Sequence, residues 1–221
     1  MYVYMYVASI YDPVGFLAPS VLTGKIILQK MCKKGLSWDD ELPNELRPLW
    51  EKWKADIMNL KTVEIPRCYK PPDFGPVTKI ELHHFSDAST EGYGACLYLR
   101  FIGNGRLRTS LFVAKARVSP TKTVTVPRLE LTAAVIAVKL GIKVKKELQI
   151  HIDKEYYWSD SKVVLAYISD DQRRFGVFVA NRVQFIREHT QVRQWHYIPT
   201  TINPADHASR GLHARELQES N

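Results

Sequence analysis

Alternation of apolar and polar residues marks three consecutive strands in the middle of the chain. The stretches are 78–89 (TKIELHHFSDAS), 92–101 (GYGACLYLRF) and 106–118 (RLRTSLFVAKARV), and the turn GNG precedes the third. β-Branched and aromatic residues at a period of two, bounded by turn residues, are typical of antiparallel strands. The pattern therefore predicts an antiparallel meander of three strands.

After residue 118 the period changes to that of helices. A helix is predicted to begin at Pro127 and run to Leu148, because proline is favoured in the first helical turn. The pattern then predicts a strand at 151–160, helices at 161–169 and 173–190, a strand at 192–199 and a helical turn at 203–211. This order predicts the α/β class, with a mixed sheet flanked by helices.

The first 77 residues show helical periodicity and no alternating stretch. Helices are predicted at 21–34, which Gly35 ends, and at 42–60, where Asn44 is placed as an N-cap. The segment 64–77 contains four prolines and is predicted to be a linker. The chain is thus divided into a small helical segment (1–77), a mixed-sheet domain (78–211) and a tail (212–221).

The composition argues against a membrane protein and against a disulfide-linked or zinc-binding protein. Hydrophobic residues make up 45% of the 221 residues, and no stretch reaches the roughly 18 apolar residues of a membrane span, so no membrane partner is expected. The cysteines Cys32, Cys68 and Cys96 are scattered and odd in number. This usage favours a reducing, intracellular location, such as a cytoplasmic particle or the nucleus, over a disulfide framework or a zinc site.

The net charge of +8 is unevenly distributed. Residues 1–77 carry ten Lys and Arg against nine Asp and Glu, whereas residues 78–221 carry 21 against 14. The mixed-sheet domain therefore holds nearly all of the excess positive charge, which suits a polyanionic partner such as a nucleic acid.

Four acids stand where predicted elements meet. Asp87 is near the end of the first strand, Glu130 is in the first turn of the long helix, Asp160 follows the fourth strand and Asp206 starts the last helical turn. The strands that carry Asp87 and Asp160 can be parallel neighbours, whose carboxyl ends meet at one edge of the sheet. Clustered carboxylates need a counter-charge, which Mg²⁺ supplies. Two such ions about 4 Å apart can activate water and stabilise the leaving oxygen of a phosphodiester.

The motifs around these acids resemble the ribonuclease H type 1 fold. FSDASTEGYGACLY, PRLELTAA, YYWSDSKVVLAYI and INPADHASRG occur in this order along the chain. More narrowly, IYDPVGFLAPS, LSWDDELP, VPRLELTAAV, FVANRV and NPADHASRG are similar to the BEL/Pao family of LTR retrotransposon polyproteins. The resemblance extends from about Ile10 to Gly211.

The resemblance implies that two parts of the chain belong to different domains of the polyprotein. Residues 78–211 would form a ribonuclease H domain, and residues 10–77 the end of a reverse transcriptase, its thumb or connection region. Asp87, Glu130, Asp160 and Asp206 would be the catalytic, metal-binding acids for two Mg²⁺ ions, with Mn²⁺ as an alternative. The implied reaction is endonucleolytic hydrolysis of the RNA strand of an RNA–DNA hybrid. The implied partners are that hybrid and the rest of the polyprotein, including reverse transcriptase and integrase.

Residues near the acids are candidates for nucleic-acid contacts. Ser89, Ser161 and Asn203 are expected at 2′-hydroxyl groups. Phosphate contacts are expected from Arg128 and Arg182 and from the lysines of the long helix, Lys139, Lys143, Lys145 and Lys146. Each assignment has a structural alternative. The aspartates suit turns and N-caps, Glu130 could complement the helix dipole, and the cations suit solvated helix faces.

Two other functions are weighed against the nuclease. One is a non-catalytic nucleic-acid-binding or connection module. The other is a peptidase, since the family also bears the label Pao retrotransposon peptidase. The chain has no DTG or DSG triplet, which counts against an aspartic peptidase. It also has no YxDD motif, so polymerase activity is not expected. The loop 197–206 lacks the histidine that ribonuclease H relatives carry before the last aspartate. His207 is expected to point away from the acids.

Overall fold

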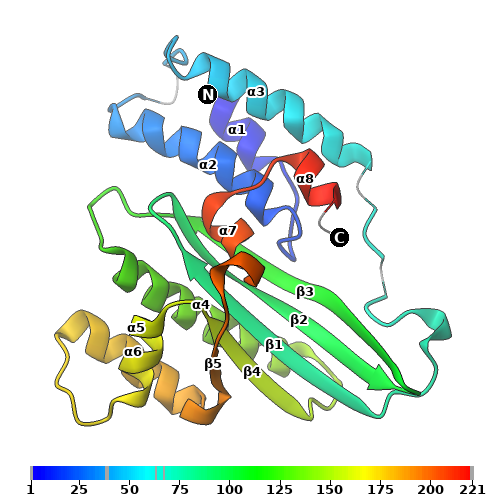
Figure 1. Ribbon diagram of the computed structural model, residues 1–221. Coiled ribbons are helices and arrows are strands. Elements are labelled where there is room, and N and C mark those ends of the chain that lie inside the picture. Colours follow the sequence, from blue (N-terminus) through cyan, green and yellow to red (C-terminus); the bar gives the residue numbers. More distant parts are fainter. Residues whose placement is uncertain (1, 38–39, 63, 67, 220–221) are drawn as a thin grey trace.

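A five-stranded mixed sheet forms the centre of the computed structural model, which describes residues 2–37, 40–62, 64–66 and 68–219. The strand order is β3-β2-β1-β4-β5 (Figure 1). The strands are β1 (Lys79–Ala88), β2 (Gly92–Gly103), β3 (Arg106–Val118), β4 (Lys154–Ser159) and β5 (Trp195–Tyr197). The first three form the predicted antiparallel meander, and β4 and β5 extend it in parallel. The predicted α/β fold class is confirmed.

Three helices of the sheet domain pack against one another. They are α4 (Val126–Glu147), α5 (Lys162–Ser169) and α6 (Val177–His189). Helix α4 lies against β1 and β2, and its Ala133, Ala134 and Ala137 are fully buried there. These small side chains let the helix axis approach the strands closely, which fixes the height of Glu130 above the sheet.

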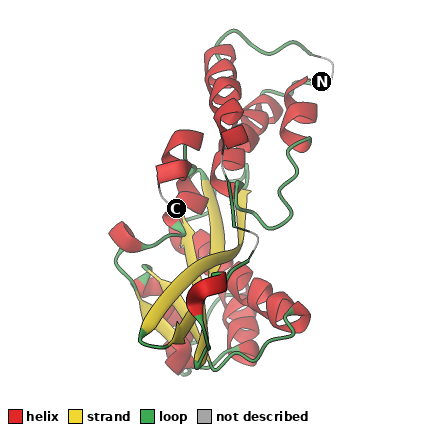
Figure 2. Ribbon diagram, turned by 90° about the vertical axis from the view of Figure 1, so that its right-hand side faces the viewer, coloured by secondary structure: helices red, strands yellow, loops and turns green. Residues whose placement is uncertain are grey.

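A separate helical unit caps one end of the sheet, above β3 in Figure 1. It contains α1 (Tyr2–Ala8), α2 (Ala18–Lys33), α3 (Arg47–Ile57) and α8 (Ala214–Glu219). Figure 2 shows these helices together at one end of the molecule. Trp50 and Trp53 form their core with Tyr6, whose ring meets both indoles edge-on. The indole of Trp53 donates a 2.8 Å hydrogen bond to the carbonyl of Ser20, so its polar atom is satisfied.

The helical unit is joined to the edge of the sheet. Leu22 and Ile26 of α2 pack against Ala116 of β3, and the amide of Ala114 donates to the carbonyl of Val14 over 2.8 Å. Gly15 has a φ of +80°, and a Cβ there would lie 1.8 Å from the Ala114 carbonyl oxygen. Only glycine allows this close approach of backbone to an edge strand.

Several boundaries differ from those predicted. Helix α1 has no counterpart in the prediction, and α3 begins at Arg47 because Pro48 occupies its first turn; Asn44 is not its cap. The last strand is only Trp195–Tyr197, since a 3₁₀ turn takes Val192–Gln194.

The expected tail, 212–221, folds back as α8 within the described residues. Ala214 is fully buried, and its amide donates to Asp56 Oδ2 of α3 over 2.7 Å. Residues 220 and 221 lie outside the described part. None of the helices described is both long and apolar enough to cross a bilayer.

Candidate active site

Asp87 and Asp160 meet at the carboxyl end of two neighbouring strands. β1 and β4 pair in parallel with Ser86 opposite Ser159, so the next residue of each chain segment is one of the two acids. Asp87 is the ninth of ten residues of β1, and Asp160 directly follows β4. The predicted parallel pairing is therefore confirmed.

Glu130 reaches the same end of the sheet from α4. It is the fifth residue of the helix, beyond the first turn, so the explanation of a first-turn acid that complements the helix dipole does not apply. The hydroxyl of Ser161 donates a 2.5 Å hydrogen bond to Glu130 Oε2. The same hydroxyl accepts the amide of Val164 over 3.2 Å and so caps α5. Ser161 thus joins Glu130 to the residue after Asp160.

Asp206 is brought in by α7 (Asp206–Arg210), which lies directly on β2. A Cβ on Gly94 would lie 3.0 Å from the Cβ of Ala208, and one on Gly92 would lie 2.9 Å from the Ser209 carbonyl. Gly94 is also the strand partner of Asp87. Two glycines in β2 therefore provide the room that lets α7 approach Asp87. The hydroxyl of Ser209 completes the contact by donating to Asp87 Oδ2.

Asn203 fixes the loop in front of α7. It is buried, with 3% of its surface exposed. Its Nδ2 donates to the carbonyl of Ser86 over 3.2 Å, and its Oδ1 accepts the amide of Ala205 over 3.1 Å. One side chain therefore ties the loop before Asp206 to the strand that carries Asp87.

Burial and neighbouring acids raise the pKa of two of the four carboxyl groups, those of Asp87 and Glu130. Burial, together with the charges of Asp160 and Asp206, raises the pKa of Asp87 from 3.8 to about 6, against the hydrogen bond from Ser209. Burial and the charge of Asp160 raise the pKa of Glu130, while Ser161 lowers it. The hydrogen bond to Asp206 raises the pKa of Arg210, and the charges of Asp87 and Asp160 act in the same direction. Four acids at one edge repel each other and favour a cation between them.

The donor set fits a hard divalent cation. Thr200 Oγ1 donates to Asp160 Oδ2 over 2.7 Å, whereas Asp160 Oδ1 is buried without a hydrogen-bond partner. A buried carboxylate oxygen without a partner is costly, and a metal ion would satisfy it. In the described part of the chain, no three Asp, Glu, His or Cys side chains are placed to hold an ion as they stand. The acids share one edge of the sheet, and binding would have to draw them closer.

The predicted nucleic-acid contacts divide into two groups. The hydroxyls of Ser89 and Ser161 and the amide of Asn203 bond within the fold; Ser89 donates to the Ser209 carbonyl over 2.7 Å and forms the turn after β1. Arg182 is half-buried, and its guanidinium carbon lies 3.5 Å from the centre of the Phe178 ring. These four residues hold the site together. Arg128 is exposed, and its guanidinium carbon also lies over the Phe178 ring, 5.3 Å from its centre.

Three supporting residues are absent from the sequence prediction: Thr200, Ser209 and Arg210. Each bonds to one of the acids, and all three lie in the segment around NPADHASR. No spacing rule connects Thr200 with Asp160, or Ser209 with Asp87, because the partners meet only through the fold.

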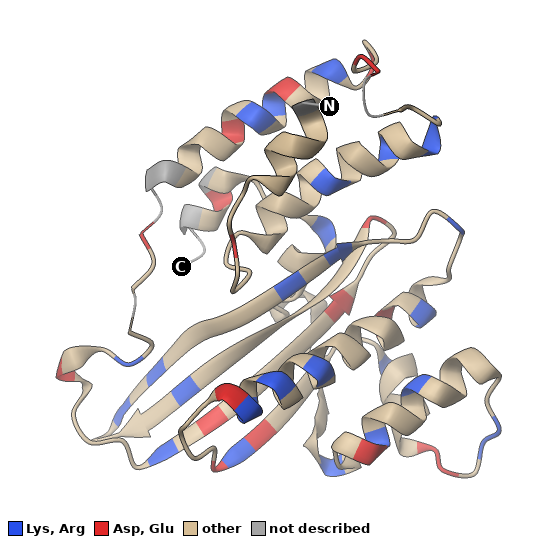
Figure 3. Cartoon of the chain, turned by 180° about the vertical axis from the view of Figure 1, so that it is seen from behind, with Lys and Arg blue, Asp and Glu red and all other residues tan. Residues whose placement is uncertain are grey.

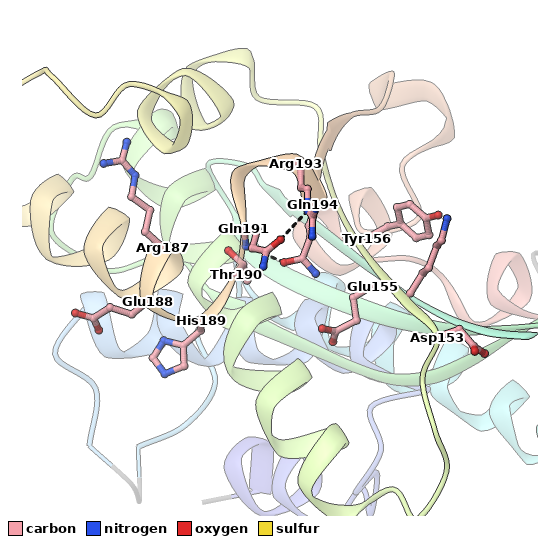
Figure 4. A pocket seen from close by; sticks show the side chains of 11 residues that line it. Asp153, Glu155, Tyr156, Arg187, Glu188, His189, Thr190, Gln191, Arg193 and Gln194 are labelled. Carbon is pink, nitrogen blue, oxygen red and sulfur yellow. Dashed lines mark hydrogen bonds between the residues drawn. The ribbon is translucent and has the colours of Figure 1, made fainter.

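Two hollows mark the ends of the sheet domain. A hollow of about 470 Å³ lies beside Asp206 and is also lined by Thr200, His207 and Arg210. His207 lines the same hollow as Asp206. A larger hollow of about 820 Å³ lies at the opposite end of β4, around Glu155 and Tyr156, and contains none of the four acids (Figure 4).

Comparison with known proteins identifies a family. The family described as Pao retrotransposon-like RNaseH-like domain matches residues 2–161, a span that includes Asp87, Glu130 and Asp160 and ends before Asp206. No curated protein matches the chain.

Solved structures similar to this chain include three ribonuclease H proteins. RNase H1 from the halophilic archaeon Halobacterium salinarum is 11% identical, with a TM-score of 0.39 over 65% of this chain and 99% of that one. The N-terminal RNase H domain of a Mycobacterium tuberculosis protein is 10% identical, with a TM-score of 0.39 over 66% and 96%. LC11-RNase H1, solved in complex with an RNA/DNA hybrid, is 13% identical, with a TM-score of 0.32 over 59% and 93%. With TM-scores below 0.5, the assignment rests on the family match and on the strand order.

Proposed function

The chain belongs to the Pao retrotransposon-like RNaseH-like domain family, and from this premise we propose that it is a ribonuclease H. Its reaction would be the endonucleolytic hydrolysis of the RNA strand of an RNA–DNA hybrid, dependent on two divalent metal ions. The observation that carries the proposal is the parallel register of β1 and β4, which sets Asp87 beside Asp160 at one edge. Ser161 ties Glu130 to that same edge.

The residues that would hold the metal ions are Asp87, Glu130, Asp160 and Asp206. When bound, the ions would supply an activated water and stabilise the departing 3′ oxygen of the phosphodiester. The protein would supply position: Ser161, Ser209 and Thr200 each hold one carboxylate by a hydroxyl donor. Asp160 Oδ1 is buried without such a donor, so a cation bound there would supply its missing partner.

Three of the four acids accept a hydrogen bond from a hydroxyl group of a neighbouring side chain. A hydroxyl orients a carboxylate without neutralising it, so the negative charge that attracts a metal ion is kept. Only Asp206 bonds to a cation, Arg210, over 2.7 Å. This arrangement is consistent with Mg²⁺ as the preferred metal, since its ligands are all oxygens, and Mn²⁺ could replace it.

The wider context of the proposal is a retroelement polyprotein. The partners would be the RNA–DNA hybrid and the polyprotein's other parts, reverse transcriptase and integrase. Residues 1–77 would be the end of the reverse transcriptase, and their helix α2 packs on β3 of the sheet domain.

A cleavage assay tests the proposal. A labelled RNA–DNA hybrid is incubated with Mg²⁺ and with the wild type, Asp87→Asn or Glu130→Gln. The controls are Asp171→Asn and Glu91→Gln, which change exposed acids outside the site. We expect cleavage of the RNA strand by the wild type and both controls, and its loss in both site variants.

The results that contradict the proposal are also distinct. Binding of the hybrid by the wild type without cleavage would favour a non-catalytic scaffold. Cleavage that survives Asp87→Asn would show that the reaction does not depend on these acids.

A further inference from the structure

Four exposed cations from three elements surround one position on the edge strand. They are Lys25 of α2, Lys115 and Arg117 of β3 and Lys143 of α4, here called the basic patch. Figure 3 views the molecule from behind and shows Lys and Arg positions on α2, on β3 and on α4. Lys115 and Arg117 are two residues apart on a strand, so they point to the same face.

The charges of the basic patch are not balanced by the protein around them. Within the described residues, none of the four cations forms an ion pair or a hydrogen bond with an acid. Burial and the charges of Arg117, Lys143 and Lys25 lower the pKa of Lys115, which shows that like charges repel there. By contrast Lys145, on the other side of α4, pairs with Glu155 over 2.9 Å.

Asp12 is an acid whose charge acts on a member of the patch, and it also accepts a backbone hydrogen bond. Asp12 attracts Lys25, but its Oδ2 accepts the amide of Leu17 over 2.9 Å. A cluster of exposed cations concentrates anionic partners at the surface and speeds their association. The patch therefore has the charge of a polyanion site.

The basic patch is held rigidly, although it spans two parts of the chain. Gln29 of α2 donates to the carbonyl of Ser119, just after β3. Leu22 and Ile26 of the same helix pack against Ala116, the residue between Lys115 and Arg117. The position of Lys25 relative to the strand is thus fixed by packing before any ligand arrives.

The patch is separate from the candidate active site. Asp87 pairs with Gly94, and Gly94 pairs with Ala116, so these three share one face of the sheet. Lys115 and Arg117 flank Ala116 and therefore point to the opposite face.

We propose that the basic patch is a second nucleic-acid contact, which binds the phosphate backbone and spans the helical unit and the sheet domain. The choice of nucleic acid as the polyanion rests on the proposed function. The charge and the geometry of the patch are independent of that function. Contacts of this kind position a nucleic acid without recognising its sequence. The helical unit would then take part in binding through Lys25.

Binding measured without cleavage tests this inference. All variants carry Asp87→Asn, divalent metal is absent, and fluorescence anisotropy follows labelled hybrid and DNA duplexes of equal length across a range of salt concentrations. The test variant is Lys115→Gln with Arg117→Gln and Lys143→Gln. The control removes three other exposed cations, through Lys33→Gln, Lys52→Gln and Lys154→Gln.

We expect the test variant to bind both duplexes more weakly and to lose about 2 to 3 units from the slope of log K against log salt, since each phosphate contact contributes about 0.9. Lys25→Gln alone should lose about one unit. The control should keep the slope of the parent. Thermal melting checks that each variant is folded.

Two results overturn the inference. One is a test variant that matches the control in affinity and slope. The other is weakened binding of the hybrid alone, because backbone contacts weaken all duplexes alike. The wild type could fail to cleave while the patch variants still reduce the slope of log K against log salt. That result would contradict the proposed function and support the second nucleic-acid contact.

Discussion

The hydroxyl of Ser161 lies between two helices and serves both, donating to Glu130 Oε2 over 2.5 Å and accepting the amide of Val164 over 3.2 Å. One atom therefore caps α5 and orients an acid of α4 that is 31 positions earlier in the chain. Stability and site geometry are coupled at this residue.

Ser161→Ala should weaken both functions of the hydroxyl. Loss of an N-cap is expected to lower the free energy of unfolding by about 1 kcal/mol. Cleavage should fall as well, because Glu130 loses the donor that orients it. Urea denaturation and the hybrid assay measure the two effects. Ser161→Thr keeps the hydroxyl and serves as the control; an alanine variant with full stability and activity would show that the bond is dispensable.

Asp87→Asn should make the protein more stable while abolishing cleavage. The folded protein holds Asp87 at a pKa of about 6 against 3.8 unfolded, so it binds the proton more tightly than the unfolded chain. Stability from this group is present at low pH and is lost as the pH rises from about 4 to 6. The asparagine variant should therefore gain about 1 to 3 kcal/mol at pH 7, since one pKa unit is worth about 1.4 kcal/mol.

Denaturation at two pH values checks this expectation. The gain should be present at pH 7 and small at pH 3.5, where Asp87 is protonated in the folded protein and mostly protonated in the unfolded chain. An equal gain at both pH values would mean that the effect is not electrostatic.

Asn203→Ala should detach the loop before α7 from β1. Two hydrogen bonds would be lost, and the Ser86 carbonyl would be left without its partner in a buried place. The expected loss of stability is about 1 to 3 kcal/mol. Cleavage should fall further than stability alone explains, because Asp206 follows this loop. Asn181→Ala, on the exposed side of α6, is the matched control and should change neither quantity.

Arg182→Gln should act on stability and not on binding of the hybrid. Its guanidinium stacks on Phe178 and donates to Thr132 Oγ1 over 3.2 Å, which joins α6 to α4. A loss of about 1 to 2 kcal/mol is expected from these contacts. Arg128→Gln is the comparison, because Arg128 is exposed and lies farther from the same Phe178 ring, at 5.3 Å. Its loss should weaken binding at a smaller cost in stability than the loss of Arg182. A folded Arg182→Gln variant with a reduced affinity would instead restore this residue to the substrate contacts.

The sequence by itself determined the order of the strands and long helices of the sheet domain and placed four acids where these elements meet. Period-two alternation marked β1 to β3 with boundaries close to those observed, because one face of each strand is buried and the pattern records it. The positions of Asp87 and Asp160 at strand ends followed from the same pattern. The predicted parallel pairing of their strands needed only the rule that a helix connects them.

Only the tertiary structure decided what surrounds the acids. Ser209 lies 122 positions from Asp87 and Thr200 lies 40 from Asp160, and no local pattern records such pairs. The hydroxyl of Ser89 and the amide of Asn203 were expected to face a ligand, but they bond inside the fold because their backbone neighbours demand partners. The packing of α8 on α3 and the gathering of Lys25 with Lys115 also depend on surfaces that meet only after folding. The periodicity of a sequence records which face of an element is buried, and the partner of that face is chosen by the packing of the whole chain.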